Sequence, residues 1–170
     1  MIVFPSREEY IKKNFFELFF EEKRPDFDKF KDLDSAEMHY LVEIFNWDDS
    51  TEVLNWIVDS AGCDKGTALM IFWRSSPDYY LGKDSIDDYD KDILYLLEKI
   101  IQRFKLQNFK KSKIKYDPAE DFDVQTSISE VEAWGLPQEM FKPTRGFRPI
   151  YVGTLLKFLQ KHFKTSKKRR

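Results

Sequence analysis

Three aspartates in one short stretch are the first candidates for chemistry. Asp48 and Asp49 are adjacent, and Asp64 follows fourteen intervening residues later. Carboxylate oxygens are the ligands that Mg²⁺ and Ca²⁺ prefer, so a metal-dependent hydrolase using the Asp48/Asp64 region is one hypothesis. Asp49 and Asp64 also precede apolar-periodic segments, where a helix N-cap belongs. We therefore interpret Asp49 and Asp64 as helix caps, expect Asp48 to be exposed, and predict no metal ligands.

Cys63, His39 and His162 are the remaining candidates for a nucleophile or a base. A helix N-terminus can lower the pKa of a thiol, but nucleophilic catalysis by Cys63 also needs a base that the sequence does not place. The two histidines lack the spacing of a zinc site or a hydrolytic triad. Gly66-Thr67 lacks the spacing of a phosphate-binding loop, and close packing better explains the glycine. We expect structural or surface roles for these residues, with no catalytic residue and no cofactor.

A pair of tyrosines among aspartates is the candidate for binding a partner protein. Tyrosine is favoured at protein interfaces, and acidic clusters steer basic partners. The predicted partner-binding residues are Asp78, Tyr79, Tyr80, Asp84, Asp87 and Asp88. A solvated loop with aspartates that cap the next helix would show the same pattern, so both interpretations stay open.

Charge is unevenly distributed along the chain. Residues 1–104 carry 13 Lys and Arg against 23 Asp and Glu, a balance of −10, whereas residues 105–170 carry 15 against 7, a balance of +8. The acidic part favours a basic protein partner. The basic part could contact phosphates, which keeps a nucleic-acid-associated function as an alternative. The net charge of −2 and the lack of a recognition-helix pattern argue against specific nucleic-acid binding.

Helical periodicity predicts the elements that must position these residues. Ser6 and Glu9 resemble a capping box, and Asp34 and Glu37 are expected to start the next helix. The expected helices cover about residues 6–22, 34–45, 49–61, 64–74, 90–104, 127–134 and 150–163, with a short turn near 27–30. No pair of facing strand signals is evident.

The fold class that follows is mainly α: a single compact domain of about six or seven helices over residues 1–164, followed by a basic tail at 165–170. The helix at about 65–74 is apolar on all sides, which is typical of a buried central helix. We expect five aromatic residues to pack near it: Phe45, Trp47, Trp56, Phe72 and Trp73. In the last helix, the apolar stripe consists of Val152, Leu155, Leu156, Leu159 and Phe163.

Composition limits the classes of protein to which the chain can belong. A length of 170 residues with 42% hydrophobic residues suffices for one cored domain. No apolar run approaches the roughly 20 residues of a membrane span, and from the short apolar run at residues 1–5 we expect no signal peptide. The single cysteine excludes an internal disulfide. We expect a cytoplasmic protein with neither a membrane nor a specific nucleic acid as its partner.

Two short motifs resemble a known family. Asn46-Trp47-Asp48-Asp49, followed by the run from Cys63 to Trp73, is similar to the signature of a small bacterial domain family of unknown function, over about residues 35–82. The resemblance implies no reaction. By analogy with small bacterial proteins of this kind, we expect a non-enzymatic protein-binding protein, an immunity or antitoxin-like protein that neutralises a toxin.

Overall fold

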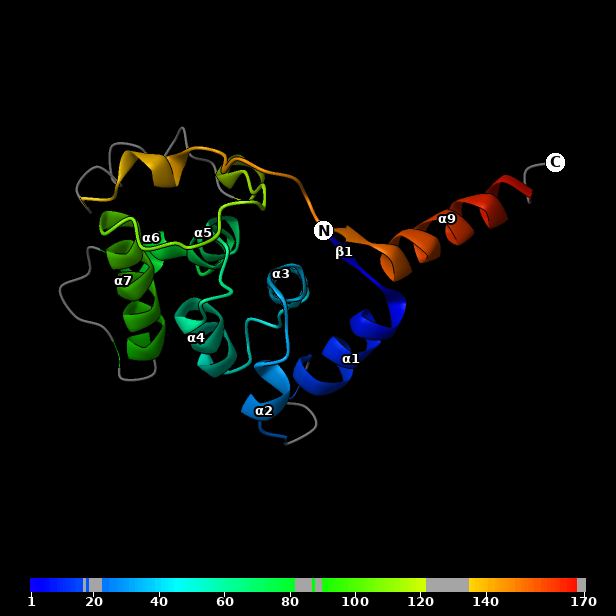
Figure 1. Ribbon diagram of the computed structural model, residues 1–170, viewed down its shortest axis with the longest axis horizontal. Helices are drawn as coiled ribbons and strands as arrows, with labels where there is room; N and C mark the ends of the chain where they lie inside the picture. The colour runs from blue at the N-terminus through cyan, green and yellow to red at the C-terminus, as the bar shows by residue number, and fades with distance from the viewer. Residues whose placement is uncertain (17, 19–22, 82–86, 88–89, 122–134, 168–170) are drawn as a thin grey trace.

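The computed structural model describes residues 1–16, 18, 23–81, 87, 90–121 and 135–167, and these form a mainly helical, compact domain (Figure 1). In chain order the helices and strands are β1 (Ile2–Val3), α1 (Pro5–Phe15), α2 (Phe27–Phe30), α3 (Ser35–Glu43), α4 (Glu52–Asp59), α5 (Lys65–Arg74), α6 (Pro77–Tyr80), α7 (Lys91–Lys105), the 3-10 turns η2 (Pro118–Glu120) and η3 (Gln138–Phe141), β2 (Ile150–Tyr151) and α9 (Val152–Lys167). None of the described helices is long and apolar enough to cross a membrane.

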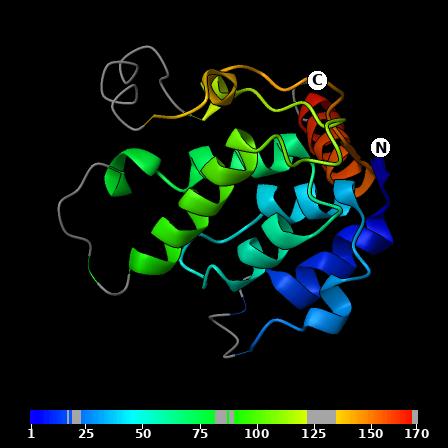
Figure 2. The ribbon, with the colours of Figure 1, turned by 60° about the vertical axis from the view of Figure 1, so that its left-hand side comes forward.

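Helix α5 lies at the centre, as its sequence predicts. Every residue from Gly66 to Trp73 is buried. Helices α3, α4, α6 and α7 pack around it, and α7 lies against both α4 and α5 (Figure 2). The Trp73 indole donates a hydrogen bond of 2.8 Å to the Met140 carbonyl, so the segment around η3 is attached to this core. Burial on all sides explains why the apolar residues of α5 show no single stripe.

Helix starts follow the predicted caps in two places and differ in two. Asp34 and Glu37 form the capping box of α3, and Asp64 caps α5. Helix α4 instead begins at Glu52 with Thr51 at its N-cap, so the prediction that Asp49 caps this helix is wrong. Helix α1 begins at Pro5, because proline fits the first helical position, and the capping box at Ser6 does not form.

One helix is shorter than predicted, and another predicted helix falls outside the described residues. Helix α1 ends at Phe15, where Phe16 takes an extended conformation, rather than continuing to about residue 22. Residues 17 and 19–22, and the helix expected at 127–134, lie outside the described part of the chain.

The expected aromatic core is only partly formed. Phe72 and Trp73 are fully enclosed and Phe45 is buried. Trp56 packs against the rings of Phe27 and Phe30 on α2, with centroids 5.1 and 5.5 Å away. Trp47 is at the surface with its ring against Phe45, contrary to the expectation that it joins the core.

A short parallel strand pair joins the two ends of the chain. Ile2 pairs with Ile150 and Val3 with Tyr151. This pairing was not expected, because two-residue strands leave no periodic signal. It places the first residue of α9 directly beside the start of α1.

Glu8 fixes the beginning of α9 to the body. Its buried carboxylate accepts hydrogen bonds from the backbone amides of Gly153 and Thr154, at 2.6 and 3.0 Å, and from the Thr154 hydroxyl at 2.9 Å. A carboxylate at a helix N-terminus satisfies amides that have no partner within the helix and complements the helix dipole. A Cβ at position 153 would lie 2.9 Å from the Glu8 carboxylate, so a larger residue there would require the Glu8 side chain to shift.

Replacing Glu8 with alanine is therefore expected to detach α9 and to lower the free energy of unfolding by about 2–3 kcal/mol, since several hydrogen bonds to a charged group are lost. Hydrogen exchange of the amides of residues 153–162 measures the detachment. Glu9→Ala is the matched control, because Glu9 is exposed. Equal exchange in both variants would contradict this role for Glu8.

The apolar stripe of α9 is not packed on the body, contrary to the sequence prediction. Leu155, Leu156 and Leu159 are 40% to 49% exposed, and Phe158 is 57% exposed. Figure 1 shows α9 projecting away from the other helices beyond the strand pair. Periodicity predicts the amphipathic helix correctly but does not say what covers its apolar face.

Candidate functional site

Asp64 is the central residue of the alternative metal hypothesis. Both of its carboxylate oxygens accept hydrogen bonds from backbone amides. Its Oδ1 accepts from the amides of Gly66 at 2.9 Å and Ile114 at 3.2 Å, and its Oδ2 accepts from the amide of Lys113 at 2.7 Å. The residue is 1% exposed, whereas Asp48 is exposed. Asp64 therefore joins residues 111–114 to the start of α5. In the described part of the chain, no group of three or more His, Cys, Asp or Glu side chains could hold a metal ion.

Gly66 allows the same segment to approach α5. A Cβ at this position would lie 2.3 Å from the Ile114 carbonyl oxygen, so only glycine fits. That carbonyl also accepts a hydrogen bond of 2.8 Å from the Thr144 hydroxyl. The close packing expected for Gly66 is confirmed, and the packing element is a loop far away in the sequence.

Cys63 is enclosed in the core. Burial raises the pKa of its thiol to about 12, with smaller and opposing effects from Arg103 and Asp64. A thiol that stays protonated is a poor nucleophile, because the thiolate is the reactive form. The position suits a small apolar residue, as its sequence context predicts.

His39 is a buried, neutral histidine. Burial lowers its pKa to about 3, and its Nδ1 lies 3.0 Å from the Thr67 hydroxyl. Its Nε2 lies 3.9 Å from the carboxylate of Glu43, whose pKa is raised by burial. Thr67 thus pairs with His39 across α3 and α5 rather than supporting the cap at Asp64. His162 lies far away on α9, where its ring contacts Phe158 with centroids 4.0 Å apart.

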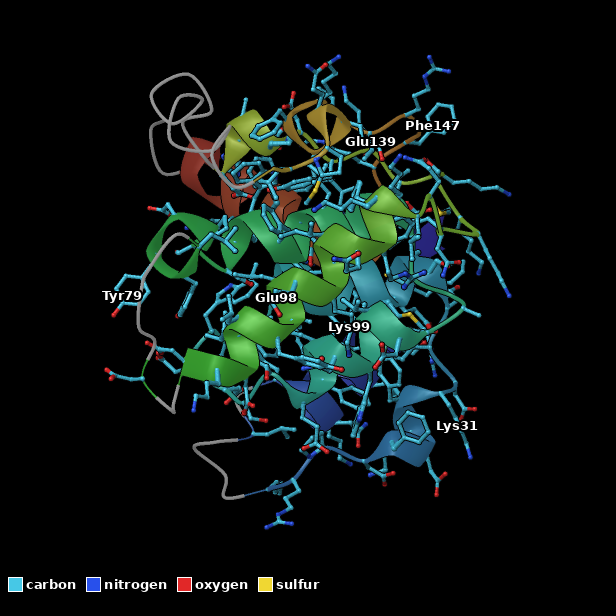
Figure 3. The ribbon with its side chains drawn as sticks, turned by 90° about the vertical axis from the view of Figure 1, so that its left-hand side faces the viewer. Lys31, Tyr79, Glu98, Lys99, Glu139 and Phe147 are labelled. Atoms are coloured by element: carbon cyan, nitrogen blue, oxygen red, sulfur yellow. The ribbon has the colours of Figure 1, made fainter. Side chains whose placement is uncertain are left out.

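The predicted partner-binding residues begin on α6, which is a short helix rather than a loop. Asp78 and Tyr79 are exposed, while Tyr80 is half-buried with its ring 4.9 Å from that of Tyr79. Pro77 is buried, and Ser76 takes the left-handed conformation (φ 51°) that turns the chain from α5 into α6. In Figure 3, Tyr79 points away from the body at the edge of the molecule. Asp87 is exposed; Asp84 and Asp88 lie outside the described residues.

Helix α7 continues this surface with residues that the sequence analysis missed. Tyr95 is 60% exposed, and it lines a hollow of about 670 Å³ together with Leu81 and the exposed Leu106. Glu98 is exposed on α7 (Figure 3). Lys99 sits over the Tyr95 ring at 4.9 Å and also donates to Asn55 and Asp59 of α4. Tyr95 interrupts the polar face of an otherwise regular amphipathic helix. This irregularity is the feature of the sequence that could have identified Tyr95 as a candidate binding residue.

We call Asp78, Tyr79, Leu81, Tyr95 and Leu106 the α6–α7 surface. Its acidic character belongs to the α6 end, where burial and the nearby charge of Asp90 raise the pKa of Tyr80. The hollow at the other end is also lined by Lys99, Arg103 and Lys105. The surface thus combines exposed aromatic and apolar area with acidic side chains at the α6 end and basic side chains around the hollow.

Residues 33–105 match the sequence model of a family described as Domain of unknown function (DUF4274). No curated protein and no solved structure matches the chain. The matched segment runs from the residue before the α3 cap to the end of α7, so it includes α5 and the α6–α7 surface but leaves out α1, the strand pair and α9. The central helices of this chain are therefore similar to a small domain family whose function is unknown.

Proposed function

We propose that this protein is a non-enzymatic protein-binding protein, and that it acts in the bacterial cytoplasm as an immunity or antitoxin-like protein that neutralises a toxin encoded beside it. The observation that supports the proposal is the exposure of Tyr79, Tyr95 and Leu106 on the α6–α7 surface. Helices α6 and α7 and the residues that end them hold this aromatic and apolar area in solvent, which is typical of surfaces that contact other proteins.

The chemistry of the surface favours a partner with a basic contact patch. Asp78 is exposed on α6, and Asp87 is exposed beside the start of α7, where its carbonyl accepts a hydrogen bond from the Asp90 amide. Such charges speed the encounter with a basic protein. Tyr79 and Tyr95 offer large contact areas that lose little conformational entropy on binding. Steering by the carboxylates and contact by the tyrosines would then contribute to different steps of the same association.

The two alternatives have less support. A metal-dependent hydrolase using Asp48 and Asp64 would require the Asp64 carboxylate to give up three backbone amides. A nucleic-acid-associated function would use the basic C-terminal part, but phosphates would leave the apolar face of α9 exposed. The buried states of Cys63 and His39 also favour binding over catalysis.

The proposal is tested on the purified protein and the product of the neighbouring toxin gene. The double variant Asp78→Lys with Asp87→Lys is expected to slow association about tenfold at low salt, because it reverses the steering charges. Tyr79→Ala is expected to speed dissociation about tenfold, because it removes contact area. Association and dissociation rates are measured by surface plasmon resonance.

The matched control is Asp32→Lys with Asp48→Lys, which makes the same charge change at exposed positions outside the α6–α7 surface. The proposal is supported if the variant Asp78→Lys with Asp87→Lys no longer neutralises the toxin while the control variant still does. Unchanged rates in the first pair and in Tyr79→Ala would show that another face binds the toxin, and failure of the wild-type protein to bind would overturn the function itself.

A further inference from the structure

The apolar and basic residues of α9 lie on opposite sides of a helix that solvent surrounds. At 100° per residue, Leu155, Leu156 and Leu159 fall within one face, and Lys157 and Lys161 fall on the opposite one. Every side chain from Thr154 to His162 is exposed. The main contacts of α9 with the body are those to α1 and β2, and a helix of 16 residues with so little packing along its length is marginally stable in water. Its apolar face therefore needs a second surface.

More exposed apolar residues gather at the base of α9. Ile2 and Ile150 face each other in the strand pair, and each is about half-exposed. Met1 and Ile2 line a hollow of about 470 Å³ together with three lysines and two aspartates: Lys110, Lys111, Lys113, Asp34 and Asp64. Apolar area at the end of the chain thus lies among lysines, as it does along α9.

Phe147 repeats the pattern nearby. It is 80% exposed, and it hydrogen-bonds through its backbone to Lys113 and Lys115, whose side chains are exposed. In Figure 3 its ring points outward from the body. An exposed phenylalanine flanked by lysines suits a binding surface whose outer layer is anionic and whose interior is apolar.

The charge of this region is one-sided. Residues 140–170 contain ten Lys and Arg and no Asp or Glu, since the last acidic residue of the chain is Glu139. A second copy of α9 would bring like charges together with no carboxylate to pair them. The occupant of this surface must therefore be anionic and must also accept leucine side chains.

We propose that α9 and the exposed residues at its base dock on an anionic phospholipid membrane surface. An amphipathic helix with a lysine-bearing polar face, a leucine- and phenylalanine-bearing apolar face and low net hydrophobicity lies in the plane of the lipid headgroups. Lysines near such a surface are attracted by its negative potential. Membrane docking departs from the expectation that no membrane is a partner. That expectation considered only a membrane-spanning segment, which a helix lying on the membrane does not need.

Glu8 gives the docking a defined geometry. Because its carboxylate holds the amides of Gly153 and Thr154, α9 leaves the body in a fixed direction. The α6–α7 surface belongs to other helices and stays available to a protein partner. Membrane docking is thus independent of the proposed toxin binding, and either can fail without the other.

The experiment measures flotation of the full chain with vesicles. Vesicles of equal parts phosphatidylglycerol and phosphatidylcholine are compared with vesicles of phosphatidylcholine alone. The wild-type protein is expected to float with the anionic vesicles only, and less so as salt is added, because salt screens the lysines.

Two variants separate the apolar from the electrostatic contribution. Leu155→Ser is expected to weaken binding about tenfold, and its control is Leu106→Ser, an equal change at the exposed leucine that follows α7. Lys157→Gln with Lys161→Gln is expected to weaken binding about fivefold per lysine, and its control is Lys29→Gln with Lys31→Gln on α2. All four positions in the test and control lysine pairs are exposed, so the fold is expected to persist, which circular dichroism verifies.

Three results would overturn the proposal. Absence of flotation with anionic vesicles would refute membrane docking directly. If Leu155→Ser leaves flotation unchanged, attraction between charges alone causes the binding, and the apolar face of α9 does not dock. A dimer in analytical ultracentrifugation that Leu155→Ser dissociates, without flotation of the wild-type chain, would identify a second copy as the occupant.

Discussion

Replacing Asp64 with alanine is expected to lower the free energy of unfolding by about 3–5 kcal/mol, because three backbone amides lose their acceptor and a buried unpaired amide costs about 1–3 kcal/mol. Two of these amides, of Lys113 and Ile114, belong to a loop that the carboxylate holds against α5. The substitution therefore damages both the helix start and the attachment of the loop. Urea denaturation followed by circular dichroism measures the change.

Asp48→Ala is the matched control for this prediction. Asp48 is exposed, and surface substitutions usually change stability by no more than about 0.5 kcal/mol. The same samples test the metal hypothesis, because a metal ion that binds the native state raises the melting temperature of the protein. Stabilisation by Mg²⁺, Ca²⁺ or Mn²⁺ that Asp64→Asn abolishes would show that the carboxylate binds metal as well as amides.

The sequence predicts those features that local physics determines. The capping box of α3 needs only Asp34 and Glu37, and the periodic stripe of α7 needs only its own residues. The burial of α5 is evident because its apolar residues cover every side. Where two local signals compete, the prediction is wrong: Pro5 begins α1 ahead of Ser6, and Thr51 precedes α4 in place of Asp49.

Contacts between distant segments could not be predicted in this way. The pairing of Ile2 with Ile150 joins residues at opposite ends of the chain, and two-residue strands have no period. Glu8 looks like an ordinary acidic residue in the first turn of a helix, yet its partners are amides of α9. Such contacts depend on the path of the whole chain.

In the candidate site too, some residues could be predicted from local sequence and others depend on contacts between separate segments. Composition located the exposed Asp78 and Tyr79, because acid and tyrosine cluster in the sequence there. Tyr95 and Leu81 join them only because α6 folds back against α7, a packing that no short motif encodes. The exposure of α9 was also missed, since an apolar stripe looks the same whether it faces a core or solvent.

Phe72→Ala is expected to lower the free energy of unfolding by about 3–5 kcal/mol, the range for truncating a buried phenylalanine. Phe72 is completely buried in α5, and its ring contacts that of Trp73 edge-on with centroids 5.1 Å apart. The loss has two causes: apolar area is no longer removed from water, and the surrounding helices leave a cavity that they cannot fill without moving.

Phe147→Ala makes the same change in side-chain volume at an exposed position, and its effect on stability is expected to stay within about 0.5 kcal/mol. Comparing the two by urea denaturation separates burial from the loss of an aromatic ring. Equal stability of Phe72→Ala and the wild-type protein would show that α5 is not the centre of the core. The pair also separates stability from docking, because Phe147→Ala should weaken binding to anionic vesicles while Phe72→Ala acts on the fold.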